Sequence, residues 1–192
     1  MNRAVQRCHG QWIQFLNCGD TLPQPTVLES VKRQIQASSK INFFYGNVHK
    51  PHSRAGVTLY PSRLSKGFVY DRMVCQQAWF VERNLAQKYS FTTESRIGGD
   101  DIWLKERVAR NEMTTQRLPE VVVAYRGGGL SEQSDLQLES QAFRDAARRR
   151  LYSVPERIFL NVRGDARKIF KSLIYDPFLW RLVRRRRRKH VK

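Results

Sequence analysis

The sequence predicts an α/β fold. Short apolar segments rich in β-branched and aromatic residues, which are typical of buried strands, alternate with longer segments whose apolar residues recur at helical spacing. Strands that alternate with helices along one chain indicate an α/β architecture. The chain has 192 residues, of which 41% are hydrophobic, and this is enough for one domain with its own core.

The first expected elements lead into a polar turn. Residues 2–9 predict a helix with a basic face, and Gly10 ends it. The apolar segment 12–16 predicts a strand that runs into the turn 17–20. A strand that ends in a carboxylate beside a glycine often directs an acid toward a ligand, because α/β sheets bind ligands at the carboxyl ends of their strands.

The next helix and two strands follow from capping and composition. Thr26 and Glu29 have the spacing of a capping box, which predicts a helix over residues 26–37. Segment 41–48, which reads INFFYGNV, is rich in aromatic and β-branched residues and predicts a strand. A short strand is expected over residues 57–60.

The middle of the chain predicts a loop, a strand and a helix. Residues 61–67 are rich in Pro, Ser, Lys and Gly, and we expect a mobile loop there. A strand is expected over residues 77–82 and a short helix over 83–89. Large aromatic residues at strand and helix spacing are usually buried, and those expected in the core are Phe43, Phe44, Trp79, Phe80 and Trp103.

The last elements of the domain begin with consecutive acids. Residues 98–101, which read GGDD, begin a helix that continues over 102–112. Segment 121–125 predicts a strand that three glycines end, at 127–129. A long polar helix is expected over residues 133–152.

Cysteine usage and hydropathy restrict the class of protein. The three cysteines are odd in number and show no disulfide pattern, which suits a reducing cytosol. No segment approaches the roughly 20 consecutive apolar residues that span a bilayer. We therefore expect a cytoplasmic protein that is soluble or peripheral to a membrane.

Five segments carry a resemblance to a known family. They are Met1–Ala4 (MNRA), Phe15–Asp20 (FLNCGD), Cys75–Phe80 (CQQAWF), Ile97–Leu104 (IGGDDIWL) and Val122–Ser131 (VVAYRGGGLS). In this order and at this spacing the chain resembles family-2 glycosyltransferases, in the colanic-acid branch of surface-polysaccharide synthesis. The resemblance implies transfer of a sugar from a nucleotide-diphospho-sugar to a polysaccharide or lipid-linked acceptor, usually with inversion.

The resemblance also implies a fold and a domain organisation. It predicts a GT-A domain with a mixed sheet over residues 1–152, corresponding to the C-terminal two-thirds of the family domain, and a basic helical tail over 153–192. The family's opening strand and its acidic VDGGSxDGT-type turn, which hold the nucleotide, do not occur. We therefore expect an incomplete and inactive domain, through either truncation or a misplaced start codon.

Asp100 and Asp101 are the candidate catalytic residues. Asp100 matches the family's catalytic base, and Asp101 is either structural or directed toward the acceptor. The alternative is that these acids only cap the helix and interact with its dipole. Neighbouring helical residues point about 100° apart, so one acid can cap while the other faces a cleft.

Four further residues are candidates for the donor side of the site. The family's DxD metal motif corresponds here to Asn17 and Gly19, with Asp20 the one acid left, so the resemblance implies donor binding by Asn17 and Asp20 and a divalent metal, Mg or Mn, on Asp20. The alternative for this pair is an Asx-type turn. Gln77 and Gly128 are the other donor-side candidates. The alternative for Gln77 is that it only fills a position in a strand, and the alternative for Gly128 is that it only lets the chain leave a strand.

The tail carries most of the positive charge. Residues 144–192 contain 17 of the 35 Lys and Arg but only 4 of the 17 Asp and Glu, and so hold +13 of the formal net charge of +18. Three short helices are expected, beginning near Pro155, Asp165 and Asp176, the last leading into the cations 184–189. Apolar residues beside a cationic segment favour an anionic membrane surface on the inner face of the cell membrane. The alternatives for the tail are nucleic-acid binding, although the rest of the chain lacks a motif for it, and a solvated basic tail. The alternative for the whole chain is a basic nucleic-acid- or membrane-binding protein without catalytic activity.

Overall fold

The computed structural model describes residues 1–51, 56–129 and 133–174, with the backbone alone for 169–174. The chain divides into two units, residues 1–151 and residues 152–192. The first unit holds the sheet and the candidate site. The second unit is described by its helix alone.

The first unit alternates helices and strands, which confirms the predicted α/β class. Its elements are α1 (Asn2–Arg7), β1 (Trp12–Ile13), α2 (Val27–Gln36), β2 (Phe43–His49), β3 (Val57–Thr58), α3 (Lys66–Asp71), the 3₁₀ turn η1 (Gln76–Ala78), β4 (Trp79–Glu82), α4 (Arg83–Lys88), α5 (Gly99–Ala109), β5 (Thr115–Ala124) and α6 (Ser134–Leu151). The second unit contains α7 (Val154–Ile174).

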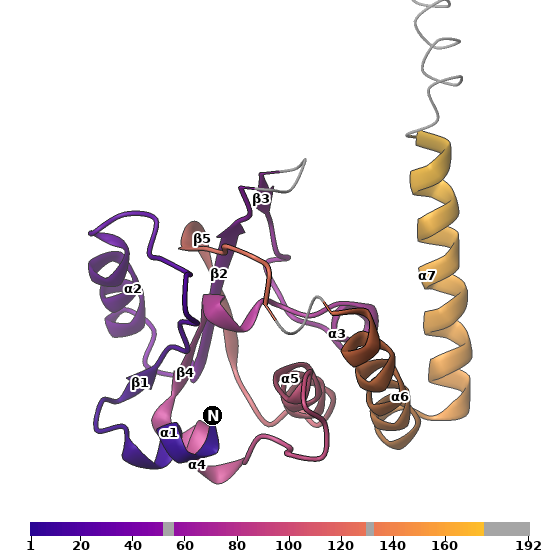
Figure 1. The fold of residues 1–192 in the computed structure, drawn as a ribbon, viewed down its shortest axis with the longest axis horizontal. Helices are drawn as coiled ribbons and strands as arrows, with labels where there is room; N and C mark the ends of the chain where they lie inside the picture. The colour runs from indigo at the N-terminus through magenta and orange to yellow at the C-terminus, as the bar shows by residue number, and fades with distance from the viewer. Residues whose placement is uncertain (52–55, 130–132, 175–192) are drawn as a thin grey trace, which may run out of the picture. The chain divides into compact units, whose positions relative to one another are not determined.

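The sheet is mixed and β2 is its central strand. β2 pairs antiparallel with β4 over residues 43–45 and with β3 at its far end, and it pairs parallel with β5. β1 pairs antiparallel with β4. Figure 1 shows α2 on one side of the sheet and α5 on the other, while α5 packs against α3 and α6. The expected mixed sheet is confirmed.

The core is built from large aromatic side chains between the sheet and α5. Trp103 of α5 stacks on Trp79 of β4 with ring centroids 6.0 Å apart, and on Phe91 at 5.2 Å. The ring centroids of Phe43 and Trp79 lie 5.4 Å apart. All five aromatic residues expected in the core are buried, which confirms that prediction.

Several strands differ in length from the expectation; those expected over 57–60 and 77–82 are confined to Val57–Thr58 and Trp79–Glu82. The expected strand 12–16 is confined to Trp12–Ile13, because Gln14 turns to donate from Nε2 to the backbone oxygen of Gln77 at 2.8 Å. The expected strand 121–125 begins earlier, at Thr115. Proline disfavours a strand interior, but here Pro119 lies where the β2–β5 register shifts, and its carbonyl accepts from Asn47 Nδ2 at 2.7 Å.

Two helix starts also differ. The segment expected to be mobile leads into α3, where Ser65 Oγ accepts from the backbone N–H of Phe68 at 3.1 Å and so caps the helix. The expected helix over residues 26–37 forms, but the Thr26 side chain makes no capping hydrogen bond. The capping-box pattern therefore predicted the helix correctly, although Thr26 does not form the capping hydrogen bond.

In the second unit, α7 is one continuous helix where two short ones were expected. Ser153 and Glu156 form the capping box at its start: Glu156 Oε2 accepts from the Ser153 N–H at 2.8 Å, and Ser153 Oγ accepts from the Glu156 N–H at 3.4 Å. Asp165 does not begin a new helix but pairs with Lys168 at 2.9 Å. The third expected helix and the cations 184–189 lie outside the described residues.

Candidate functional site

The candidate site combines residues of the turn after β1, the segment after β2, the start of α5 and the segment before η1, which act on the thiol of Cys75. Asp20 and Asp100, 80 positions apart in the sequence, both act electrostatically on the thiol of Cys75, and so does Lys50. Cys75 in turn contacts Gln77. These five residues are called the edge cluster below.

Asp20 is held in place by the end of β5. The turn closes with the Asp20 N–H donating to the carbonyl of Asn17 at 3.1 Å, and Thr21 exchanges two backbone hydrogen bonds with Ala124. Oδ1 of Asp20 accepts from the backbone N–H of Arg126 at 2.8 Å. The residue is only 8% exposed, and among the described residues its Oδ2 has no hydrogen-bond partner although it is buried. One carboxylate oxygen is thus fixed and the other is available.

Gly19 allows Arg126 to approach this turn closely. Gly19 has a φ of +90°, a conformation that favours glycine, and a Cβ there would lie 2.8 Å from Arg126 Cδ. Asn17, at the start of the same turn, is exposed. The turn is therefore a backbone turn closed at Asp20, while the carboxylate of Asp20 is used to join β5.

Asp100 occupies the first turn of α5. The helix begins after Gly98, whose φ of +82° places it in the left-handed region, and a Cβ at Gly99 would lie 2.8 Å from the carbonyl oxygen of Thr92. Burial raises the pKa of the Asp100 carboxyl above its usual range, and the neighbouring charge of Asp101 raises it further. The backbone N–H groups of Asp100 and Asp101 oppose this shift. The side chain thus contacts helix N–H groups and still has the pKa direction suited to a base near neutral pH.

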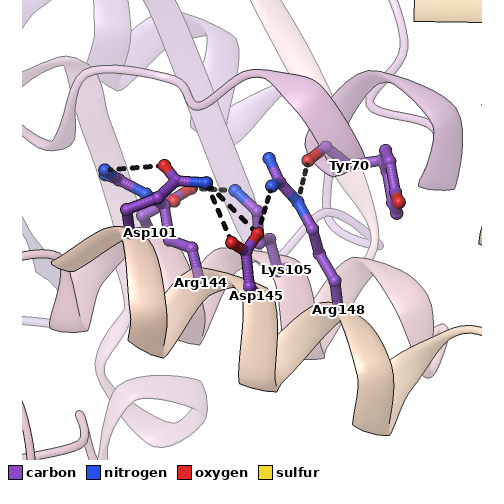
Figure 2. A network of polar contacts seen from close by, with 7 residues as sticks. Tyr70, Asp101, Lys105, Arg144, Asp145 and Arg148 are labelled. Atoms are coloured by element: carbon purple, nitrogen blue, oxygen red, sulfur yellow. Dashed lines mark hydrogen bonds and ion pairs between the residues drawn. The ribbon is translucent and has the colours of Figure 1, made fainter. Parts of the chain in front are cut away.

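Asp101 lies on a different side of α5 and is part of a buried network (Figure 2). It forms an ion pair with Lys105, one turn later, and both side chains are almost fully buried. Burial lowers the pKa of Lys105, whereas the charge and hydrogen bond of Asp101 raise it. Of the two roles expected for Asp101, this geometry favours the structural one.

The network extends to two other helices. Arg148 of α6 donates from Nε to the backbone oxygen of Tyr70 in α3 at 3.0 Å and pairs with Asp145 at 2.8 Å. The guanidinium groups of Arg144 and Arg148 also act on Lys105 and lower its pKa. As Figure 2 shows, these residues connect α3, α5 and α6 on the side of α5 that carries Lys105. The sequence pattern did not identify Lys105, because a lysine in a polar helix is ordinarily exposed.

Gln77 and Cys75 form a buried polar pair beside the acids. The Cys75 thiol donates to Gln77 Oε1 at 2.8 Å, and the backbone N–H of Cys75 donates to the hydroxyl of Tyr60 at 2.9 Å. Burial raises the pKa of Cys75 to about 11, so the thiol stays protonated near neutral pH and is a poor nucleophile. Gln77 is 6% exposed, and its side-chain oxygen is already used by the thiol.

Gly128 is in the loop that follows β5. It has a φ of +75°, it is exposed, and a Cβ there would have no heavy atom within 4 Å. Glycine is thus favoured here by the backbone conformation and not by a lack of space. Asn17 and Gly128 are exposed, unlike Asp20 and Gln77, so the four donor-side candidates do not share one buried environment.

Lys50 and Arg126 were not identified from the sequence. Lys50 follows β2, and its Nζ lies 5.2 Å from the ring centroid of Tyr125, which directly precedes Arg126. The Tyr125 N–H donates to the carbonyl of His49 at 2.8 Å, which brings the two strand ends together. The only available sequence signal was that each cation comes within two residues of the end of a strand, which holds for many surface residues.

A divalent cation, as implied by the family resemblance, fits the edge cluster in part. Among the described residues there is no group of three or more His, Cys, Asp or Glu that could enclose a metal ion. The buried Oδ2 of Asp20 fits one coordination position. Mg²⁺ is commonly bound by one or two carboxylates together with substrate phosphates. These side chains therefore suit a cation that arrives with a diphosphate better than one held by the protein alone.

No protein-family model matches the chain, and no curated protein matches its sequence. The function is therefore argued from the residues of the site.

Proposed function

We propose, in contrast to the inactive domain expected from the sequence, that the chain is a glycosyltransferase of GT-A type, which moves a sugar from a nucleotide-diphospho-sugar to a hydroxyl of a polysaccharide or lipid-linked acceptor. One observation supports this proposal: two carboxylates from distant parts of the sequence, Asp20 at the segment after β5 and Asp100 at the start of α5, act on the same thiol of Cys75 and have different environments. Asp20 has a buried, unpaired oxygen, while Asp100 has a raised pKa. Two acids with different environments suit two different roles in one reaction.

The proposed reaction uses Asp100 as the base. An oxygen of Asp100 accepts the proton of the acceptor hydroxyl as that oxygen forms a bond to the anomeric carbon of the donor sugar. The bond between this carbon and the diphosphate breaks, and the nucleoside diphosphate leaves with the electron pair. A base whose pKa is closer to neutral takes up a proton more favourably in the transition state, and the raised pKa of Asp100 supports this role.

Asp20 is proposed to act on the donor side. A Mg or Mn ion bound with the diphosphate would neutralise the charge that develops on the leaving group. Asp20 Oδ2 would hold that ion, and the hydrogen bond from the Arg126 N–H to Oδ1 keeps the carboxylate oriented toward the cluster edge. Gln77 holds the segment before β4 in place, since its side chain accepts from the Cys75 thiol and its backbone oxygen accepts from Gln14.

The first test is donor binding and its dependence on Asp20. UDP-glucose, UDP-galactose, GDP-mannose and GDP-fucose are titrated by calorimetry at millimolar concentration, each with and without Mg²⁺. We expect one donor to bind and Asp20→Asn to weaken its Mg²⁺-dependent binding about tenfold, because one ligand of the ion loses its charge. Asp165→Asn, in an exposed ion pair of α7, is the charge-matched control. Absence of binding by all four donors, with a folded protein, contradicts the proposal.

We further propose that the acceptor is brought to the site at an anionic membrane surface on the cytoplasmic side. Four apolar side chains of α7 are 57% to 65% exposed: Val154, Ile158, Phe159 and Val162. Three of them recur every four residues and so lie along one side of the helix. No helix in the described part of the chain has the length and apolarity to cross a membrane. An exposed apolar stripe on a cationic helix suits binding in the headgroup region instead.

Membrane binding is expected to depend on both the stripe and the charge. The double variant Ile158→Gln/Val162→Gln should lower the partition coefficient onto vesicles of mixed phosphatidylglycerol and phosphatidylcholine at least tenfold, because each side chain contributes apolar burial. High salt should release the wild-type protein, since charge attraction is screened within about 8–10 Å at physiological ionic strength.

Cosedimentation with vesicles measures this binding, with vesicles of phosphatidylcholine alone as the control. A protein that ignores anionic vesicles but binds duplex DNA or RNA would contradict membrane binding. That result would support the alternative function, a basic nucleic-acid-binding protein.

A further inference from the structure

Lys50 extends the edge cluster with a positive charge. Its backbone is fixed at the end of β2, where the Lys50 N–H donates to the carbonyl of Gly56 at 2.6 Å. Its Nζ lies 5.2 Å from the ring centroid of Tyr125, at the end of β5. The residue after Tyr125 donates its N–H to Oδ1 of Asp20. The amine and the carboxylate proposed for the donor side therefore both lie against the segment that follows β5.

The ammonium group is not neutralised by a carboxylate. In the part of the chain that the structure describes, no Asp or Glu oxygen lies within the 4.0 Å of an ion pair to Lys50. A half-exposed cation held over an aromatic ring is oriented, yet its three N–H donors remain largely available to an anion. Lysine acts as a point charge toward phosphate groups.

The fixed acids of the cluster set the kind of anion that fits. Asp20, Asp100 and Lys50 all act electrostatically on the thiol of Cys75, so an anion bound at Lys50 also experiences the charge of two carboxylates. A diphosphate has two phosphate groups, so one could contact the amine while a cation that Asp20 would hold neutralises the other. Arg126 is exposed, and its side chain packs against Gly19 in the turn that holds Asp20. It therefore supplies a second cation near that turn.

We infer that Lys50, oriented by Tyr125, binds the diphosphate of the donor and neutralises part of the charge on the leaving group, while the cation that Asp20 would hold neutralises the rest. The inference rests on the proposed function, because it names the residue that recognises the diphosphate in that same site. Lys50 is a binding residue of the edge cluster. It transfers no proton during the reaction and forms no covalent bond to the sugar.

The test uses two probes that separate the inference from the proposed function. Inorganic pyrophosphate probes the anion site alone, and UDP and GDP probe recognition of a nucleotide; each is titrated with Mg²⁺ by calorimetry into the full chain. We expect Lys50→Gln to raise the dissociation constant about tenfold for pyrophosphate and for the nucleotide that binds. Lys50→Arg, which keeps the charge, should restore most of the affinity.

Lys40→Gln is the matched control, since Lys40 precedes β2 at the opposite end of the strand from Lys50. Melting curves of each variant exclude unfolding as the cause of lost binding. Equal affinity of wild type and Lys50→Gln for pyrophosphate and nucleotide overturns the inference and leaves the proposed function standing. Lys50-dependent binding of pyrophosphate, without binding of either nucleotide, supports the anion site and contradicts the glycosyltransferase. Absence of binding by every probe overturns both.

Discussion

Replacing Asp100 with Asn should lower the rate of sugar transfer by about 10²- to 10⁴-fold, the usual contribution of a general base. Donor affinity should change little, because a base acts mainly in the transition state. The measurement is initial-rate kinetics with the donor identified by titration, together with calorimetric donor binding. Glu94→Gln removes one negative charge from an exposed position six residues earlier and is the control.

The pH dependence gives this prediction a second readout. Asp100 acts in its ionised form, so wild-type kcat/KM should rise with pH through a midpoint above the ordinary range of an aspartate, since burial raises its pKa. A raised pKa in the folded state means that ionisation opposes folding: the associated stability is present below the ordinary pKa and is lost as pH rises. Asp100→Asn should therefore unfold at the same or a higher temperature than wild type at pH 7, and the difference should shrink toward pH 4.

A different result would assign Asp100 to capping alone. If the Asn variant keeps its transfer rate within about threefold of wild type while folded, the base must be another group. The edge cluster offers no second carboxylate except Asp20, whose Oδ1 is engaged with the backbone of Arg126.

Lys105→Met should lower the free energy of unfolding by about 3–5 kcal/mol, because it leaves Asp101 buried without its partner. The double variant Asp101→Leu/Lys105→Met should recover most of this loss, since a buried ion pair and an apolar pair of similar volume are often nearly equal in stability. Urea unfolding followed by circular dichroism measures both.

The exposed ion pair of α7 provides the control for this comparison. The Asp165 and Lys168 side chains are 66% and 81% exposed, and breaking such a pair costs about 0–1 kcal/mol. If Lys105→Met costs no more than Lys168→Met, the buried network does not hold α3, α5 and α6 together. Retained donor binding by the double variant would further show that Asp101 is structural.

The sequence predicted most elements because their signals are local. The apolar spacing of α2 and the aromatic and β-branched residues of β2 are read directly from neighbouring positions. β1 was overestimated because Gln14 leaves the sheet to bond Gln77, a contact across 63 positions. β5 was underestimated because Pro119 normally ends a strand, and the register shift that accommodates it depends on β2.

The same distinction applies to the candidate site. Asp20 and Asp100 were found because each lies in a short motif, at a strand end and at a helix start. Asp101 could not be separated from Asp100 by sequence, because its partner Lys105 becomes buried only when α5 packs against α3 and α6. Lys50 and Tyr125 lie 75 positions apart, and no local pattern connects them.

The parallel pairing of β2 with β5 has a kinetic consequence. It joins residues 43–49 to residues 115–124, so a chain segment of about 70 residues must be closed before the first hydrogen bond of this ladder forms. Lys50 and Asp20 are both anchored to the end of β5, so the edge cluster is absent until that late step is complete. A diphosphate bound across the two strand ends should therefore slow the separation of β2 from β5, and hydrogen exchange of the Tyr125 amide would report ligand occupancy.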